Sequence, residues 1–317
     1  MKKQLLIAAV AATMGTAAMA DLSITGNAKF EFTNTETGSN AAVNATNTEV
    51  NIKIKGSHGD TTVVLNNEFN SSSAAGAGMD TEDMYISTKI GDVAVKAGNF
   101  ASGTSALGGE IDNGSRAQDK VSLSTSVGGF KIGYAVAESG SALNSDSSSV
   151  SVSGTVGGFK VSLKDDSDSY TLVGVSGDVA GFGVRLEQKN SDTANNDVTF
   201  GNITKEVNGV TLGYAWVDAD AVNLITENDS SIFAREGNGA TVDGVNQISA
   251  KLSAAGNAIT LKTGTVEEGS TDNDFTQIDV KRSLASGATL AATYTDYDVV
   301  NSADTTEKFE IDLSVKF

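Results

Sequence analysis

Histidine and cysteine, two residue types that often serve in catalysis and metal binding, are almost missing from this chain. The sequence holds one histidine, His58, and no cysteine. His58 lies in the turn-like run Ser57-His58-Gly59-Asp60 and has no second histidine with which to bind a metal ion. A Ser-His-Asp site anchored in such a turn is improbable, and no phosphate-binding, zinc-protease or dinucleotide motif is present. The sequence therefore predicts a protein that is not an enzyme and has no cofactor.

Acidic residues dominate the charge. The chain has 40 Asp and Glu against 22 Lys and Arg, a net charge of −18. This balance argues against nucleic acid as a partner, because phosphate binding needs clustered basic residues. The runs 165–168 and 272–274 superficially resemble calcium ligands, but they lack the central Gly and terminal Glu of an EF-hand. We therefore expect no dedicated metal site, and at most loosely held Ca²⁺ or Mg²⁺ where acidic loops gather.

The first twenty residues have the features of a secretory signal peptide. Lys2 and Lys3 precede a short apolar stretch, Leu5 to Met14, and Ala18-Met19-Ala20 is a typical cleavage site. Residues 1–20 are thus predicted to be a leader for the general secretory route, and 21–317 the mature domain. No later stretch approaches the ~18 apolar residues of a membrane-spanning helix.

Beyond the leader, the chain repeats one unit: a segment of alternating apolar and polar residues, followed by a turn or a loop. The final segment shows it best, since Phe309, Ile311, Leu313, Val315 and Phe317 alternate with polar residues. Several segments follow directly on Gly-containing turns such as 128–129 and 157–158. The predicted strands are 21–33, 47–56, 61–70, 81–90, 93–98, 119–127, 130–137, 148–156, 159–164, 169–176, 182–188, 198–206, 210–217, 245–254, 258–265, 275–284, 288–297 and 307–317.

The connections between these eighteen segments alternate between short turns and longer polar loops. Short turns at one end and long loops at the other are typical of an outer-membrane barrel. The predicted fold is all-β: a closed, antiparallel, transmembrane β-barrel in which 22–32 pairs with 308–317. A water-soluble β-sandwich would also alternate, but it does not predict the asymmetry of the connections.

The positions of the charges agree with a barrel that has a wet interior. The strand lysines and Arg185 fall on the polar phase of their segments, and Arg282, next to a predicted turn, is the exception. A charge that faces lipid at mid-bilayer costs roughly 2–4 kcal/mol, so the polar phase is expected to line a lumen. Two aromatic girdles are expected on the outside. Their predicted members are Phe130, Phe159 and Phe182 on the turn side, and Tyr134, Tyr170, Trp216, Phe275 and Tyr297 on the loop side.

The chain resembles the Gram-negative general diffusion porins along its whole length. The resemblance rests on the strand Asp21-Leu22-Ser23-Ile24-Thr25-Gly26, the Gly-Gly-Phe turns, and a last strand that ends in Phe317. It implies a homotrimer, a third loop folded into each lumen, and recognition of Phe317 by the outer-membrane assembly machinery. It usually implies sixteen strands, so the count of eighteen leaves sixteen open as the alternative.

The implied third loop corresponds to the connection 99–118. Glycines in this segment permit tight bends, and the resemblance implies that Glu110 and Asp112 project into the lumen, with Arg116 in the same loop. The polar phase places four lysines on the wall that faces them: Lys29, Lys53, Lys55 and Lys89. Opposed charges across a narrow passage would orient polar solutes.

These observations predict an outer-membrane porin of a Gram-negative bacterium that lets small hydrophilic solutes and ions diffuse passively. One alternative is a channel specific for one substrate; another is a secreted structural or adhesive β-protein of the surface-layer or solenoid type. More than half of the acidic residues lie in the long loops. We therefore expect a weak cation preference and contact of this rim with lipopolysaccharide through divalent cations.

Overall fold

The computed structural model describes most of the predicted mature domain. The described residues are 21–72, 76–102, 115–139, 142–167, 169–192, 197–220, 244–268, 271–298 and 304–317. The predicted leader at 1–20 and the third-loop residues Glu110 and Asp112 lie outside them. Within the described residues, no helix is long and apolar enough to span a membrane.

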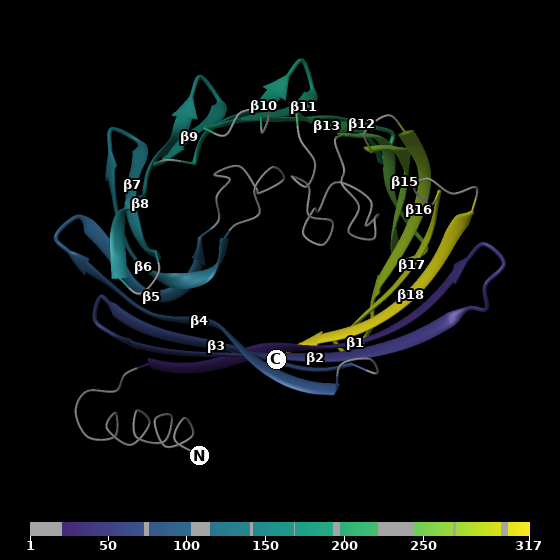
Figure 1. The fold of residues 1–317 in the computed structure, drawn as a ribbon, viewed down its shortest axis with the longest axis horizontal. Helices are drawn as coiled ribbons and strands as arrows, with labels where there is room; N and C mark the ends of the chain where they lie inside the picture. The colour runs from purple at the N-terminus through teal and green to yellow at the C-terminus, as the bar shows by residue number, and fades with distance from the viewer. Residues whose placement is uncertain are drawn as a thin grey trace.

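Eighteen strands form one antiparallel sheet that closes on itself (Figure 1). The bounds are β1 Asp21–Thr37, β2 Val43–His58, β3 Thr61–Ser72, β4 Gly76–Ile90, β5 Val93–Ser102, β6 Ser115–Val127, β7 Phe130–Ser139, β8 Ala142–Val156, β9 Phe159–Asp166, β10 Tyr170–Val179, β11 Phe182–Ser191, β12 Val198–Val207, β13 Val210–Ala219, β14 Gly244–Ala254, β15 Asn257–Glu268, β16 Thr271–Ser283, β17 Thr289–Asp298 and β18 Thr305–Lys316. Each strand pairs with its neighbours in sequence, and β1 also pairs with β18 from Asn27↔Lys316 to Thr37↔Thr306. The predicted closed barrel is confirmed, and eighteen strands, rather than sixteen, is the correct number.

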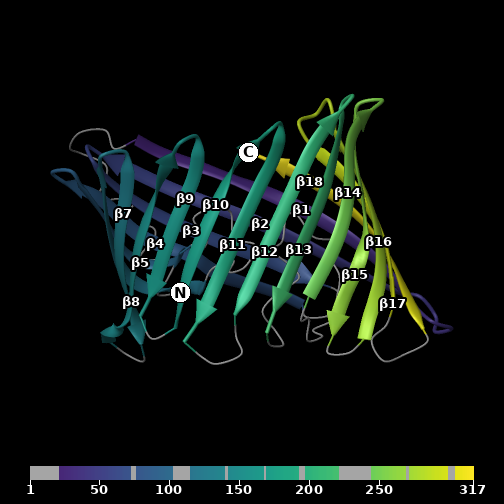
Figure 2. The ribbon, with the colours of Figure 1, turned by 90° about the horizontal axis from the view of Figure 1, so that it is seen from above.

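Short turns gather at one end of the barrel, where the C-terminus also lies (Figure 2). Gly128 and Gly129 have φ of 58° and 86°, and Gly157 and Gly158 have φ of 58° and 88°. Positive φ at both central residues is the signature of a type I′ turn, whose twist matches that of the flanking strands. The Gly-Gly pairs therefore fix where one strand ends and the next begins, which sets the register of the wall.

Aromatic rings lie over glycines of the neighbouring strand. A Cβ added to Gly154 would meet the ring of Phe130 at 2.6 Å, and one added to Gly177 would meet Phe159 at 2.6 Å. The same arrangement joins Phe317 at the end of the chain to Gly26 in β1, at 2.7 Å. A ring that covers bare backbone restores packing that glycine cannot provide. The predicted turn-side aromatics thus also hold adjacent strands together.

The two faces of the sheet differ in chemistry, as the alternation predicts. Ile24, Ile86, Val127 and Ile248 are 52–60% exposed and lie on the outer face, where the surroundings would be lipid. Residues paired directly across antiparallel strands share a face, so the register can be followed around the ring to identify the inner face. On that inner face lie the polar and charged side chains.

Candidate functional site

The inner wall of the barrel collects nearly all of the basic side chains of the described strands. Pairs such as Lys53↔Asn66 and Gly98↔Lys120 carry this face from strand to strand. The basic residues on it are Lys29, Lys53, Lys55, Lys89, Lys96, Lys120, Lys131, Lys160, Lys164, Arg185, Lys189, Lys251, Lys262, Lys281, Lys308 and Lys316. The register therefore agrees with the prediction, made from the alternation of the sequence, that these residues face the lumen.

Two basic side chains of the described strands lie on the outer face instead. Arg282 pairs with Leu290 close to the turn between β16 and β17, as its phase predicts. Lys205 pairs with Leu212, so the prediction that Arg282 is the one exception to the polar phase is wrong: Lys205 is a second. Its Nζ donates to the carbonyl oxygen of Gly181 at 2.9 Å and lies 4.5 Å from the ring centre of Phe182. Both residues are near the end of the barrel that carries the short turns, where a charged side chain can reach the boundary between lipid and water.

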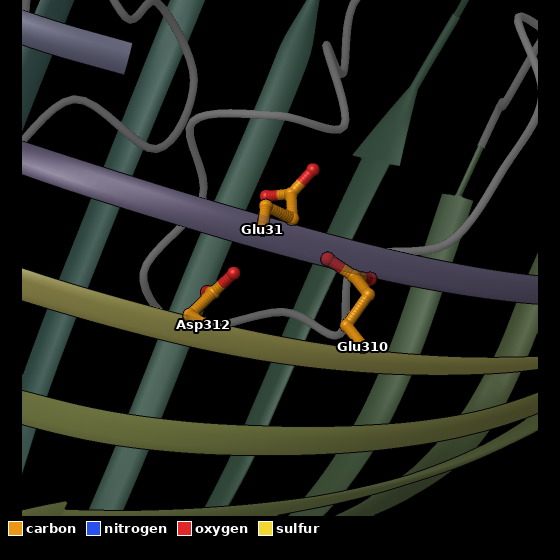
Figure 3. A group of neighbouring side chains, drawn as sticks. All are labelled: Glu31, Glu310 and Asp312. Carbon is orange, nitrogen blue, oxygen red and sulfur yellow. The ribbon is translucent and has the colours of Figure 1, made fainter. Parts of the chain in front are cut away.

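Carboxylates gather on the inner wall where β1 and β18 close the barrel. Glu31, Glu310 and Asp312 place one oxygen each within 4.8 Å of one another (Figure 3). Lys29 Nζ lies 2.5 Å from Glu31 and 3.8 Å from Asp312, and Lys308 lies 2.8 Å from Glu310. Three carboxylates so close together have the chemistry of a hard-cation site, but here two ammonium groups already supply the opposing charge.

The wall formed by β4, β5 and β6 has the opposite character. Lys96 Nζ lies 3.8 Å from the ring centres of both Tyr85 and Phe100, and Lys120 Nζ lies 4.9 Å from that of Phe100. Lys120 is only 3% exposed. Aromatic faces attract cations by roughly 0.5–1 kcal/mol, and more where water is excluded. The rings therefore hold two ammonium groups against this part of the wall.

Charged and aromatic side chains continue along β9 to β12. Lys164 lies 2.9 Å from Asp166 and donates to the hydroxyl of Tyr170, while Lys189 lies 4.5 Å from the centre of the same ring. Arg185 in β11 donates to Glu187, at 2.8 Å from Nε and 2.5 Å from Nη2. Basic side chains, their carboxylate partners and an aromatic ring therefore lie side by side along this wall.

The acidic seam and the basic wall face each other. In a ring of eighteen strands, β9 and β10 lie half-way round from β18 and β1, and Figure 1 shows them on opposite sides of the lumen. The seam carries Glu31, Glu310 and Asp312, whereas the far wall carries Lys164 on β9 and Lys189 on β11. Lys96 on β5 and Lys120 on β6 lie between these two sides. This polarity is built into the strands themselves and adds to any charge on the loops.

Some lumen-facing residues are apolar, which the sequence analysis did not predict. Leu172, Val198, Phe200, Ala215, Val217, Ala219, Val245, Val266 and Phe275 form one buried cluster on the loop half of β10 to β16, against which Tyr170 and Tyr297 pack. Three residues assigned to the loop-side girdle, Tyr170, Phe275 and Tyr297, therefore face inward, and that assignment is wrong for them. Tyr134 and Trp216 do face outward. The sequence did contain a hint of this apolar patch, because Val198 and Phe200 occupy the same phase of β12 as its polar residues.

The remaining predicted site residues are only partly placed. Lys53 and Lys55 in β2 and Lys89 in β4 face the lumen, but Lys89 lies next to the turn at 91–92, at the end opposite the third loop. Lys29 pairs with acids of the wall, Glu31 and Asp312. Arg116 is the second residue of strand β6. Phe317 takes part in the closure, because its N–H donates to the carbonyl oxygen of Gly26 at 3.0 Å and its own carbonyl oxygen accepts from the Gly26 N–H at 2.8 Å.

Comparison with solved structures gives the fold independent support. No protein-family model matches the chain, and no curated protein matches it by sequence. OccK2 (OpdF) of Pseudomonas aeruginosa aligns with a TM-score of 0.70 and 10% identity, over 94% of this chain and 98% of that one. OpdQ of the same organism gives 0.69 and 10%, over 94% and 99%. The chain has the fold of these proteins. The outer membrane protein OpdK of P. aeruginosa also matches, with a TM-score of 0.65 and 9% identity over 93% and 98%.

Proposed function

We propose that this protein is an outer-membrane porin whose lumen is a water-filled channel for passive diffusion of small hydrophilic solutes and ions. The observation that carries the proposal is the sorting of side chains by face. Charged residues line the inside of the closed barrel, and isoleucine, leucine, valine and aromatic residues cover the outside. Such a wall is stable only with lipid outside and water inside.

Barrel size supports an open passage. A barrel of eight strands is filled by its own side chains, whereas sixteen to eighteen strands leave an aqueous channel. The antiparallel closure does not fit the solenoid alternative, which would need a parallel, non-closing stack. The likeness in fold to the outer membrane protein OpdK of P. aeruginosa agrees with an outer-membrane location in a Gram-negative bacterium.

Conductance in a planar lipid bilayer tests the proposal. Purified protein whose folding is shown by heat-modifiable migration on a gel should insert and give stepwise increases in KCl current. The matched control is the same preparation after boiling, which should give no steps. Folded protein that inserts without conducting would refute the channel.

A substrate-specific channel is the second candidate, and the polarised lumen favours it. Lys164 on β9 and Lys189 on β11 oppose Glu310 and Asp312 on β18, an arrangement that would orient a solute with separated charges. One of the matched structures is OccK2 (OpdF) in complex with glucuronate. If this channel is specific for such solutes, glucuronate should reduce the KCl current with saturation, while an uncharged sugar of equal size should not.

We also propose the assembly and partners that the sequence leads us to expect. These are a homotrimer, lipopolysaccharide bound through Mg²⁺ or Ca²⁺ at the acidic loops, and delivery by the general secretory route followed by the outer-membrane assembly machinery. Chemical cross-linking in native membranes should give a band at three times the protomer mass. A band only at the protomer mass would contradict the trimer.

A further inference from the structure

A cavity opens from the lumen where the first four strands meet the end of the chain. Its volume is about 530 Å³, and besides Gly26, Glu82 and Phe317 it is lined by Thr25, Asn27, Asn51, Lys53, Asn66 and Lys316. Three of these side chains are carboxamides. The cavity lies in the turn half of the barrel, because Lys316 is the last residue of β18 and Thr25 is near the start of β1.

The register arranges these side chains as two rows across the sheet. One row runs from Lys316 through Asn27 to Asn51. The next row runs from Thr25 through Lys53 to Asn66. Neighbouring strands are about 4.8 Å apart in the hydrogen-bonding direction, so the rows form a grid of donors and acceptors on one continuous face.

Several groups of the grid keep hydrogen-bonding capacity. The Nδ2 of Asn66 donates to Glu82, which also lines the cavity, and leaves the Asn66 oxygen to accept. The Nδ2 of Asn51 donates to Glu49, while its buried oxygen has no partner among the described residues. A buried acceptor without a donor costs about 1–3 kcal/mol. A small rotation of Asn51 toward the cavity would let a solute hydroxyl satisfy it.

We infer that this cavity is a binding site for an uncharged solute with several hydroxyl groups, such as a small sugar or polyol. A hydroxyl both donates and accepts, and so does each carboxamide, whereas an ammonium only donates and a carboxylate only accepts. Grids of amides therefore match hydroxyl groups better than they match ions. The inference rests on the proposed channel function, because the solute reaches the cavity from the lumen.

The local charges agree with an uncharged ligand. Lys53 and Lys316 lie among Glu82, Glu49 and Glu68, since Glu68 pairs with Asn51 across β2 and β3. Neither sign of charge is in clear excess here, in contrast to the basic wall of Lys96, Lys120 and Lys164. The local charges would therefore contribute little to the binding free energy of an anion. Preferential binding of an anion is one outcome that the test below can reveal.

Glucose is the probe, applied to single channels of the full-length protein in KCl. We expect glucose to lower the current with saturation, and polyethylene glycol of the same hydrodynamic radius to lower it in proportion to concentration. In Asn27→Ala/Asn66→Ala the half-maximal glucose concentration should rise about tenfold, because two hydrogen bonds are lost. Asn27→Asp keeps the side-chain size but cannot donate a hydrogen bond, so it should raise the half-maximal glucose concentration by a smaller factor. This single variant keeps the site testable if the double variant does not fold.

Asn202→Ala is the matched control. Asn202 is a lumen-facing carboxamide that lines a separate cavity of about 610 Å³ between β9 and β12. It should leave the glucose response unchanged. Non-saturating glucose block in the wild type, an equal loss in N202A, or glucuronate block that alone responds to the Asn27 and Asn66 variants would each overturn the site. Absence of KCl current from folded protein would instead refute the channel itself, so the two failures are distinguishable.

Discussion

At the scale of single residues, the inner wall contains buried charges that are stable only when a residue of opposite charge lies beside them. Arg185 and Glu187 are two positions apart on β11, so both point into the lumen. The side chain of Glu187 is 1% exposed, and that of Arg185 is 16% exposed. A carboxylate so well removed from water depends on the guanidinium beside it, because an uncompensated buried charge is strongly destabilising.

We predict that Arg185→Met lowers the free energy of unfolding by about 3–5 kcal/mol, the usual cost of removing one partner of a buried pair. Urea titration in detergent micelles would measure it, with the fluorescence of Trp216, the only tryptophan, as the signal. Arg185→Met/Glu187→Gln is the control and should recover most of the loss. A double variant as unstable as R185M would show that packing by the arginine, not charge compensation, is what matters.

Sequence alone predicted which face the basic strand residues occupy, except for Lys205, but not which partner each of them takes. Period-two alternation decides the face, so the lysines were assigned to the lumen from their phase. The contacts of Lys29 with Asp312 and of Lys96 with Phe100 depend on register and on rotamers. Register follows from the turns, but a lysine of given phase can reach several neighbours, so no pattern in the sequence selects one.

At the scale of the elements, the turns determine the barrel more than the strands do. Gly158 in the turn between β8 and β9 has φ of 88°, a conformation that disfavours any residue with a Cβ. The corresponding second positions of three other turns are also glycine, at Gly181, Gly209 and Gly256. The first positions of those turns are Ala180, Asn208 and Ala255, which adopt φ of 52–54° at some cost.

Replacing Gly158 by Ala should therefore destabilise the barrel by about 1–2 kcal/mol, the penalty for a left-handed residue with a Cβ. Its counterpart, Ala180→Gly, removes a Cβ from a left-handed position and should not reduce stability. The same urea titration would compare them. Equal stability of G158A and wild type would mean that the turn relaxes to another type and does not set the register.

The last element carries a prediction about assembly. Phe317 closes the ring by two backbone hydrogen bonds to Gly26, and its ring covers that glycine. Phe317→Asp should leave unassembled protein in the periplasm and lower its level in outer-membrane fractions, as immunoblots would measure. Lys316→Gln changes the adjacent residue on the lumen face and should assemble normally. Normal outer-membrane levels of F317D would contradict an assembly role for the terminal ring.

Sequence reasoning was less successful where an element changes character along its length. The loop halves of β10 to β16 carry Phe200, Val217 and Phe275 toward the lumen, although their turn halves carry polar residues there. An aromatic residue near a loop was taken to be part of the outer girdle, and that holds for Trp216 but not for Phe275. Alternation assigns a phase to a whole strand, and it says less where both phases are apolar.

At the scale of the whole molecule, the predicted constriction of the lumen by the third loop can be tested by deleting part of that loop. The segment 99–118 begins at the end of β5 and ends within β6, and Glu110 and Asp112 are expected to narrow the lumen. Deleting 104–113 should raise single-channel conductance. Deleting ten residues from another long connection, 226–235, is the matched control and should change it less. Equal effects of both deletions would assign the constriction to neither segment in particular.

The final prediction concerns ion selectivity, in which the loops and the lumen oppose each other. The connections that the sequence predicts as long loops hold more than half of the 40 acidic residues, whereas the described inner wall is rich in lysine. Exposed loop charges act over a Debye length of ~10 Å at 0.1 M salt and ~30 Å at 0.01 M. Lowering the salt therefore extends their influence over the mouth of the channel, so a weak cation preference should strengthen as the salt concentration falls.

Reversal potentials measured in tenfold KCl gradients, centred on each of these two concentrations, would test this. Glu110→Gln/Asp112→Asn should shift the reversal potential toward that of an anion-preferring channel, because it removes two acids from the expected constriction. An anion preference that grows as salt falls would show instead that Lys96, Lys120 and Lys164 on the wall control permeation. In that case the acidic loops would serve mainly as the surface that meets lipopolysaccharide.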